Sequence, residues 1–271
     1  MSRIGSLFAS PGRKALITYL TAGYPDIGTT LEMVPLLASS GCDIVELGIP
    51  FSDPLADGAI IQKAAFHALR NGVTPAECMK LAGRLSRQVD VPLVFMTYFN
   101  PVHKYGVDAF CRDCAGAGVS GLIIPDLPPE ESEDVEQFSR DCGLDLVYLL
   151  APTSTEKRID LVASRSRGFI YLVSLTGVTG ARETLPDGLE SFVARVRARC
   201  SQPLCVGFGI STAEQARRVA RIADGVIIGS RLVQVLEAPE RLTLVRDFIS
   251  ELRHALSDAC HSELPDEEVS M

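Results

Sequence analysis

Eight short apolar runs alternate along the chain with longer amphipathic segments. The runs are rich in Val, Ile and Leu, and most of them end close to Gly, Pro, Ser or Asp. This pattern is typical of parallel strands that are buried on both faces. The predicted strands are residues 16–20, 43–47, 93–97, 121–125, 145–150, 169–173, 204–207 and 225–228.

The segments between these runs show helical periodicity. In residues 74–88, Thr74 is a candidate N-cap, Pro75 follows in the first turn, and Glu77 stands at the spacing of a capping box. The other predicted helices are residues 29–39, 156–164, 189–200 and 212–222.

Eight strands that alternate with helices predict a closed (β/α)8 TIM barrel, a fold of the α/β class. An open doubly wound sheet would show fewer strands, and a dinucleotide-binding fold would carry a glycine fingerprint after its first strand. The chain of 271 residues, 46% of them hydrophobic, suffices for one such domain. We assign residues 1–256 to the barrel and residues 257–271 to a polar, acidic tail outside it.

Composition narrows the set of partners. The net charge is −8 and basic runs are absent, which disfavours nucleic acid and anionic membranes as partners. The sequence has no apolar run long enough to cross a membrane and no signal-peptide core, so we expect a cytoplasmic protein. The eight cysteines are scattered, and Cys111 and Cys114 form a single C-x-x-C without a second ligand pair. We therefore predict packed, reduced thiols and no metal site.

Active sites of barrels lie at the carboxyl ends of the strands. The second strand ends at Glu46 and leads into a loop that holds Asp53 and Asp57 among prolines and glycines. An acid at this position faces the barrel mouth. A solvated acidic loop is the alternative interpretation.

Two glycine-rich turns near the end of the barrel are candidate phosphate sites. Strand seven leads into Phe208 and Gly209 before a helix, and strand eight leads into Gly229 and Ser230 before another. Glycines allow close backbone approach, and a helix start presents free amides to an anion. Ordinary turns that need glycine sterically are the alternative. A polar loop at residues 174–182, after strand six, is a candidate lid or a plain surface loop.

Several longer motifs carry a family resemblance. ELGIPFSDPLADG, SLTGVTGAR, GFGIS and IIGS occur in the order found in tryptophan synthase α subunits, and LITYLTAGYPD, TYFNPVHKYG and IIPDLPPEE are similar to that family too. The resemblance covers about residues 4–256. It implies the cleavage of indole-3-glycerol phosphate to indole and glyceraldehyde 3-phosphate, a retro-aldol-like reaction.

The resemblance also implies roles for particular residues. Glu46 is expected to be the general acid/base and Asp57 to hydrogen-bond the indole N–H, while Tyr171 orients Glu46 or the substrate unless it is only a core aromatic. Thr179 is expected to contact Asp57 when the loop closes. The implied phosphate cradle is Gly180, Phe208, Gly209, Gly229 and Ser230. The implied indole pocket is Tyr19, Phe99 and Ile61, for which plain core packing is the alternative.

The family works with a β subunit that joins indole to serine using pyridoxal phosphate. The resemblance therefore implies an α2β2 heterotetramer and no cofactor in this chain. The loop around Asp53 and Pro54 and residues 100–106 are similar to the α-side contact region. Leu175 departs from a basic residue found in some members, and the tail has no counterpart.

Three alternatives remain open at this point. An epimerase-like or isomerase-like phosphosugar barrel would want metal-binding histidines at strand ends, whereas His67, His103, His254 and His261 fall in predicted helices, loops or the tail. A non-catalytic allosteric partner of the β chain would have lost a carboxylate, and both are present. A stand-alone indole-3-glycerol-phosphate lyase would keep the same site residues.

Overall fold

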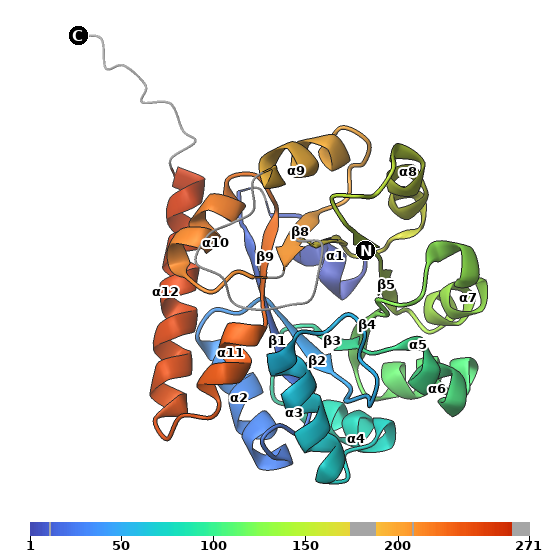
Figure 1. The fold of residues 1–271 in the computed structure, drawn as a ribbon, viewed down its shortest axis with the longest axis vertical. Helices are drawn as coiled ribbons and strands as arrows, with labels where there is room; N and C mark the ends of the chain where they lie inside the picture. The colour runs from blue at the N-terminus through green and yellow to red at the C-terminus, as the bar shows by residue number, and fades with distance from the viewer. Residues whose placement is uncertain (11, 174–187, 208, 262–271) are drawn as a thin grey trace.

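The computed structural model describes residues 1–10, 12–173, 188–207 and 209–261. Its strands form one parallel sheet in the order β5-β4-β3-β2-β1-β9-β8-β7-β6, surrounded by helices (Figure 1). This arrangement confirms the predicted TIM barrel. The strands are β1 (Ala15–Thr21), β2 (Ile44–Gly48), β3 (Leu93–Met96), β4 (Val119–Ile123), β5 (Asp145–Val147), β6 (Leu149–Leu150), β7 (Ile170–Val173), β8 (Leu204–Gly207) and β9 (Gly225–Ile228).

The predicted fifth strand is divided at Tyr148, so that β5 pairs with β4 and β6 pairs with β7. The Tyr148 N–H leaves the sheet ladder and donates to Ser166 Oγ at 3.2 Å, while its carbonyl accepts the Tyr171 N–H at 3.0 Å. The Tyr148 hydroxyl donates to Glu136 Oε1 at 2.5 Å. The two ends of the sheet, β5 and β6, are therefore consecutive in the chain and meet at Tyr148.

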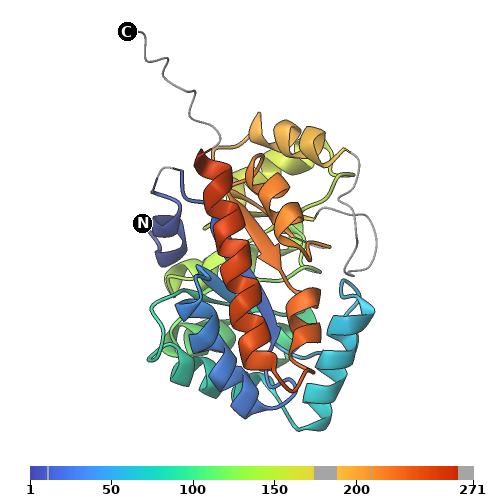
Figure 2. The ribbon, with the colours of Figure 1, turned by 90° about the vertical axis from the view of Figure 1, so that its left-hand side faces the viewer.

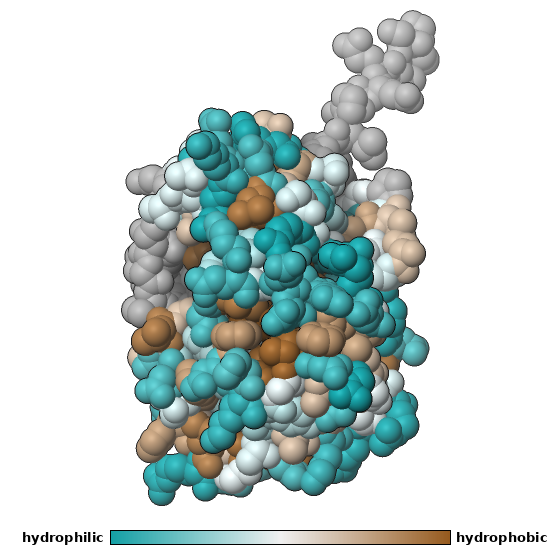
Figure 3. Space-filling view, turned by 90° about the vertical axis from the view of Figure 1, so that its right-hand side faces the viewer, coloured by the Kyte–Doolittle hydropathy of each residue, from teal (hydrophilic) through white to brown (hydrophobic). Residues whose placement is uncertain are grey.

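Helices cover the outside of the barrel, and their starts follow the capping signals in the sequence. Thr74 accepts the Glu77 N–H at 3.3 Å, as predicted, and Thr212 forms a capping box with Gln215. The side of the barrel with α6 and α7 is mostly hydrophilic, with apolar side chains in separate patches (Figure 3). The helices are α1 (Arg3–Leu7), α2 (Ile27–Ser39), α3 (Ala59–Arg70), α4 (Pro75–Leu85), α5 (Phe99–Tyr105), α6 (Val107–Gly116), α7 (Glu133–Asp141), α8 (Glu156–Arg165), α9 (Leu189–Arg197), α10 (Ala213–Ala220), α11 (Ser230–Val235) and α12 (Arg241–His261), with a 3-10 turn at Pro129–Glu131.

The amino-terminal end of the barrel is closed by α1, which lies at the opposite end from α3 and α11 (Figure 2). Ile4 of α1 is fully buried. A Cβ added to Gly121 or Gly168 would lie 2.9 or 3.0 Å from Ile4 methyl carbons, so both glycines make room for this side chain. At the same end, Asp43 accepts hydrogen bonds from Arg13 and Arg253.

The last helix, α12, runs along one side of the barrel (Figure 2) and extends to His261. It continues five residues past the position at which the sequence places the end of the barrel, because Ala259 is buried. Residues 262–271 of the expected tail lie outside the described residues.

Most of the described cysteines are packed, as predicted, while Cys142 and Cys200 are half-buried. Cys42, Cys78, Cys111, Cys114 and Cys205 are buried, and the described thiols form no disulfide. Within the described residues, no cluster of three or more His, Cys, Asp or Glu side chains could hold a metal ion. None of the described helices is long and apolar enough to cross a membrane.

The packing of Ile4 predicts that α1 is an integral part of the barrel. Ile4→Ala should lower the free energy of unfolding by about 2–5 kcal/mol, because it leaves a cavity in a fully buried site. Urea denaturation measures this value. Leu244→Ala, at a position 43% exposed, is the matched control and should change stability by about 0.5 kcal/mol or less. Equal effects of the two substitutions would show that α1 is not packed against the barrel.

Candidate active site

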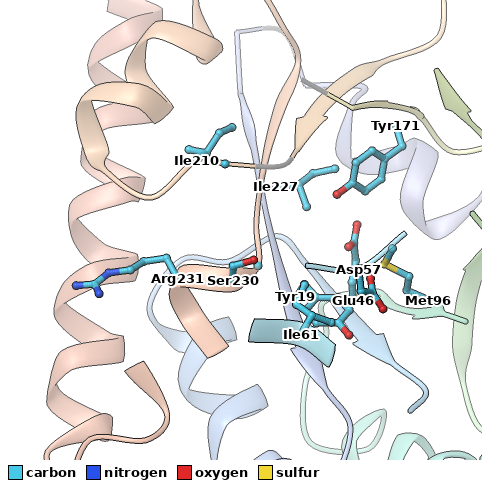
Figure 4. A pocket seen from close by; sticks show the side chains of 12 residues that line it. Tyr19, Glu46, Asp57, Ile61, Met96, Tyr171, Ile210, Ile227, Ser230 and Arg231 are labelled. Carbon is cyan, nitrogen blue, oxygen red and sulfur yellow. The ribbon is translucent and has the colours of Figure 1, made fainter. Parts of the chain in front are cut away.

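A cavity opens at the carboxyl ends of the strands (Figure 4). Its wall combines two carboxylates, two tyrosines and several aliphatic side chains with the backbone of glycine turns. The lining residues are Tyr19, Glu46, Asp57, Ile61, Met96, Tyr171, Gly209, Ile210, Ile227, Gly229, Ser230 and Arg231.

Glu46 projects from β2, where it pairs in register with Tyr19 of β1 and Val94 of β3. Its side chain has no exposed surface, and neither carboxylate oxygen accepts a hydrogen bond from the described residues. Burial without such a partner disfavours the charged form and raises the pKa of Glu46 from 4.5 to about 8. Glu46 therefore holds a proton at neutral pH.

Asp57 lies at the end of the β2–α3 loop, directly before the N-cap Gly58. Its N–H donates to the Pro54 carbonyl at 3.1 Å, and its own carbonyl accepts from Gln62 Nε2 at 2.8 Å. Burial raises the pKa of Asp57 from 3.8 to about 6, and a hydrogen bond from Tyr98 opposes this rise. At neutral pH Asp57 is thus mainly ionised while Glu46 is protonated.

Two buried tyrosines stand beside the carboxylates, and their rings fit because glycines lie next to them. Tyr171 of β7 points its hydroxyl toward the carboxylates (Figure 4), and a Cβ on Gly207 would lie 2.4 Å from that hydroxyl oxygen. The Tyr19 hydroxyl would lie 2.1 Å from a Cβ on Gly48. Burial, together with Glu46 and Asp57, raises the pKa of Tyr171, so its hydroxyl stays protonated.

The other end of the cavity consists of backbone from two turns. Gly209 adopts a left-handed conformation with φ 84° after β8, and Gly229 is the N-cap of α11, which begins at Ser230. The Arg231 guanidinium points away from the cavity (Figure 4). This end therefore offers backbone amides and a hydroxyl, the groups with which a helix start can hold an anion.

The structure brings most of the predicted site residues together. Glu46, Asp57, Tyr171, Tyr19, Ile61, Gly209, Gly229 and Ser230 all line the cavity. Phe99 is not among the described lining residues, because it begins α5 and its ring faces His103 at a centroid distance of 5.8 Å. Thr179, Gly180 and Phe208 lie outside the described residues, as does Leu175.

Sequence reasoning missed five residues of the site, one of which is Arg231, whose backbone belongs to the lining while its guanidinium points away. Met96, Ile210 and Ile227 line the cavity, and Tyr98 donates the hydrogen bond to Asp57. Met96 and Tyr98 stand at the carboxyl end of the third strand, so the rule that barrels place their chemistry there could have identified them.

Two buried carboxylates beside two glycine turns, at the carboxyl ends of the strands of a closed barrel, are typical of a barrel enzyme. Comparison with known proteins narrows the class to one family. The family model "Tryptophan synthase alpha chain" matches residues 7–259, and the chain belongs to this family.

Individual relatives agree along almost the whole length. The tryptophan synthase alpha chain of Dehalococcoides mccartyi is 57% identical over 256 residues, which cover 94% of this chain and 100% of the relative. That of Roseiflexus sp. is 50% identical over 260 residues, covering 93% and 100%. A solved structure of Mycobacterium tuberculosis tryptophan synthase superimposes with a TM-score of 0.88 at 42% identity, covering 94% of this chain and 98% of that one.

Membership of the family establishes the activity, which is the cleavage of indole-3-glycerol phosphate, the lyase half-reaction of tryptophan synthase. It also excludes the epimerase-like and isomerase-like alternatives. In this family pyridoxal phosphate belongs to the β subunit, and the α chain has no cofactor.

The unpartnered burial of Glu46 predicts a pH-dependent cost to stability. Because its pKa rises from 4.5 to about 8 on folding, the native state binds more protons than the unfolded state in this window, and stability falls as pH rises through it. Glu46→Gln should therefore gain stability relative to wild type from pH 4.5 to 8, by on the order of a few kcal/mol.

Urea denaturation at several pH values measures this difference. Glu77→Gln, a substitution in the exposed first turn of α4, is the control and should track wild type. A Glu46→Gln curve parallel to that of wild type would show that Glu46 is not buried with a proton.

Proposed function

We propose that Glu46 and Asp57 divide the cleavage reaction between a proton carrier and a stabiliser of positive charge. The observation that supports this division is the difference in their surroundings. Glu46 is fully buried and accepts no hydrogen bond from the described residues, whereas Asp57 receives one from Tyr98. The first carboxyl is thereby kept neutral and the second ionised.

Glu46 starts as the acid. It gives its proton to indole C3, and the resulting indolenine can accept the electron pair of the carbon–carbon bond that breaks. The Glu46 carboxylate then removes the proton of the side-chain hydroxyl as that carbon becomes the aldehyde. The products are indole and glyceraldehyde 3-phosphate, and Glu46 returns to its protonated state.

Asp57 and Tyr171 act around this proton transfer. The ionised Asp57 accepts a hydrogen bond from the indole N–H and stabilises the positive charge that protonation of C3 places on the ring. Tyr171 keeps its proton and faces the carboxylates, so its hydroxyl can orient Glu46 or the substrate. Tyr19 and Ile61, together with Met96, provide the wall for the indole ring.

The phosphate group is assigned to the turns at the other end of the cavity. Gly209, Gly229 and Ser230 offer amides and a hydroxyl there, and Gly180 and Phe208 are assigned to the same cradle from the family resemblance. Thr179 is assigned to loop closure on Asp57 on the same grounds.

The chain works with a tryptophan synthase β subunit, and we assign it to an α2β2 heterotetramer. Two solved relatives, both from Mycobacterium tuberculosis, are structures of tryptophan synthase. Next to the predicted contact region lies a groove whose lining includes Pro50, Phe51, Asn100 and Pro101, and the nearby Leu55 is 85% exposed. The reduced thiols of the described residues fit a cytoplasmic location.

Indole release from indole-3-glycerol phosphate tests the role of Glu46. Wild type should release indole and be accelerated by a β subunit, whereas Glu46→Gln should lose about two or more orders of magnitude in kcat, as expected for an acid/base group. Glu77→Gln is the control and should retain full activity.

The other outcomes separate the remaining alternatives. Wild type that is inactive even with β would be a binding partner only, which contradicts the proposal. Wild type that is fast alone and indifferent to β would be a stand-alone lyase. Full activity of Glu46→Gln would remove Glu46 from the chemical step.

The two pKa values predict a bell-shaped pH profile of kcat/KM. The rate should rise with pH as Asp57 ionises near 6 and fall as Glu46 loses its proton near 8. Steady-state kinetics between about pH 5 and 9 span both limbs. In Asp57→Asn the acidic limb should disappear from the residual activity. An acidic limb that persists in that variant belongs to the substrate phosphate and contradicts the assignment to Asp57.

A further inference from the structure

Tyr98 lies between β3 and α5, and its side chain contacts the β2–α3 loop that carries Asp57. It is the N-cap residue of α5, only 5% of it is exposed, and it does not belong to the lining of the cavity. Its side chain therefore influences the site through other residues.

The Tyr98 side chain contacts the β2–α3 loop at three residues. Its ring packs against Phe51, with centroids 5.4 Å apart. Its hydroxyl accepts the Ala56 N–H at 3.0 Å and donates to the Asp57 carboxylate. Because the hydroxyl has one proton and already accepts the Ala56 N–H, that proton is available to Asp57.

Among the described residues, few other hydrogen bonds restrain the Asp57 carboxylate. The neighbouring hydrogen bonds, to Pro54 and from Gln62, involve its backbone, so Tyr98 supplies the side-chain hydrogen bond among the described residues. The titratable groups that face Asp57 from other strands are Tyr19, Glu46 and Tyr171. Tyr19 instead pairs its hydroxyl with Thr21 at 3.3 Å.

We propose that Tyr98 is a positioning residue for the cleavage reaction, which aims the Asp57 carboxylate into the cavity and fixes the β2–α3 loop through contacts of its ring and hydroxyl. This proposal rests on the proposed role of Asp57. A carboxylate that accepts a hydrogen bond retains its charge at lower pH, and a fixed direction avoids reorganisation when charge develops on the indole ring.

Tyr98→Phe tests the proposal because it keeps the ring against Phe51 and removes only the hydroxyl. The acidic limb of the kcat/KM profile should move up by about one pH unit, and kcat at neutral pH should fall about tenfold with a smaller change in KM, as expected for one lost hydrogen bond to a charged group. Phe51→Leu, which weakens the ring contact and keeps the hydroxyl, should leave the acidic limb in place.

Tyr24→Phe is the matched control. Tyr24 is 4% exposed and likewise donates to a carboxylate, Glu237, at 2.5 Å, but it does not line the cavity. Removal of the Tyr24 hydroxyl should leave the pH profile of kcat/KM unchanged. Thermal unfolding of all variants identifies losses of activity that come from instability.

The double variant Tyr98→Phe/Asp57→Asn separates this inference from the proposed function. If Tyr98 acts through Asp57, the double variant should be no less active than the single variant Asp57→Asn. Additive losses, or an unmoved acidic limb in Tyr98→Phe, would overturn the positioning role. If Asp57→Asn itself retains full activity, the proposed role of Asp57 is wrong, and the positioning role of Tyr98 falls with it.

Discussion

The burial of one carboxyl group inside a closed barrel is the constraint on which the site depends. Glu46 sits on a strand whose neighbours bury it completely, and the described residues give it no hydrogen bond. Such a group stays protonated near neutral pH at a cost in stability. The other strands and helices offset this cost because they bury a continuous apolar core. In the proposed function, the protonated acid is the proton donor for the cleavage.

The amino-terminal end of the barrel is tightly packed, whereas the carboxyl end holds the candidate active site. At the amino-terminal end, Ile4 fills the interior and Asp43 binds Arg13 and Arg253. At the carboxyl end, Gly48 and Gly207 leave room for the hydroxyls of the two tyrosines. Larger residues at this end would fill the cavity.

The contrast between the two carboxylates comes from neighbours that are distant in sequence. Glu46 and Asp57 are eleven residues apart in the chain, yet one lies within a strand and the other in a loop held by Tyr98. The strand position gives Glu46 no hydrogen-bond donors among the described residues, and the hydroxyl of its neighbour Tyr19 pairs with Thr21 instead. The loop position of Asp57 admits a donor. The fold therefore sets two pKa values for one type of side chain.

The sequence alone determined the barrel, its strand order along the chain and the carboxylates Glu46 and Asp57, because periodicity and long motifs are local properties. It did not show the break at Tyr148, the extension of α12 to His261, or the placement of Phe99 outside the cavity. Those features depend on which distant side chains meet. Only the tertiary structure decided the hydrogen-bond partner of Asp57 and the absence of a described partner for Glu46. These surroundings set the opposite protonation states of the two carboxyls, because burial and hydrogen bonding arise when strands far apart in sequence close into one barrel.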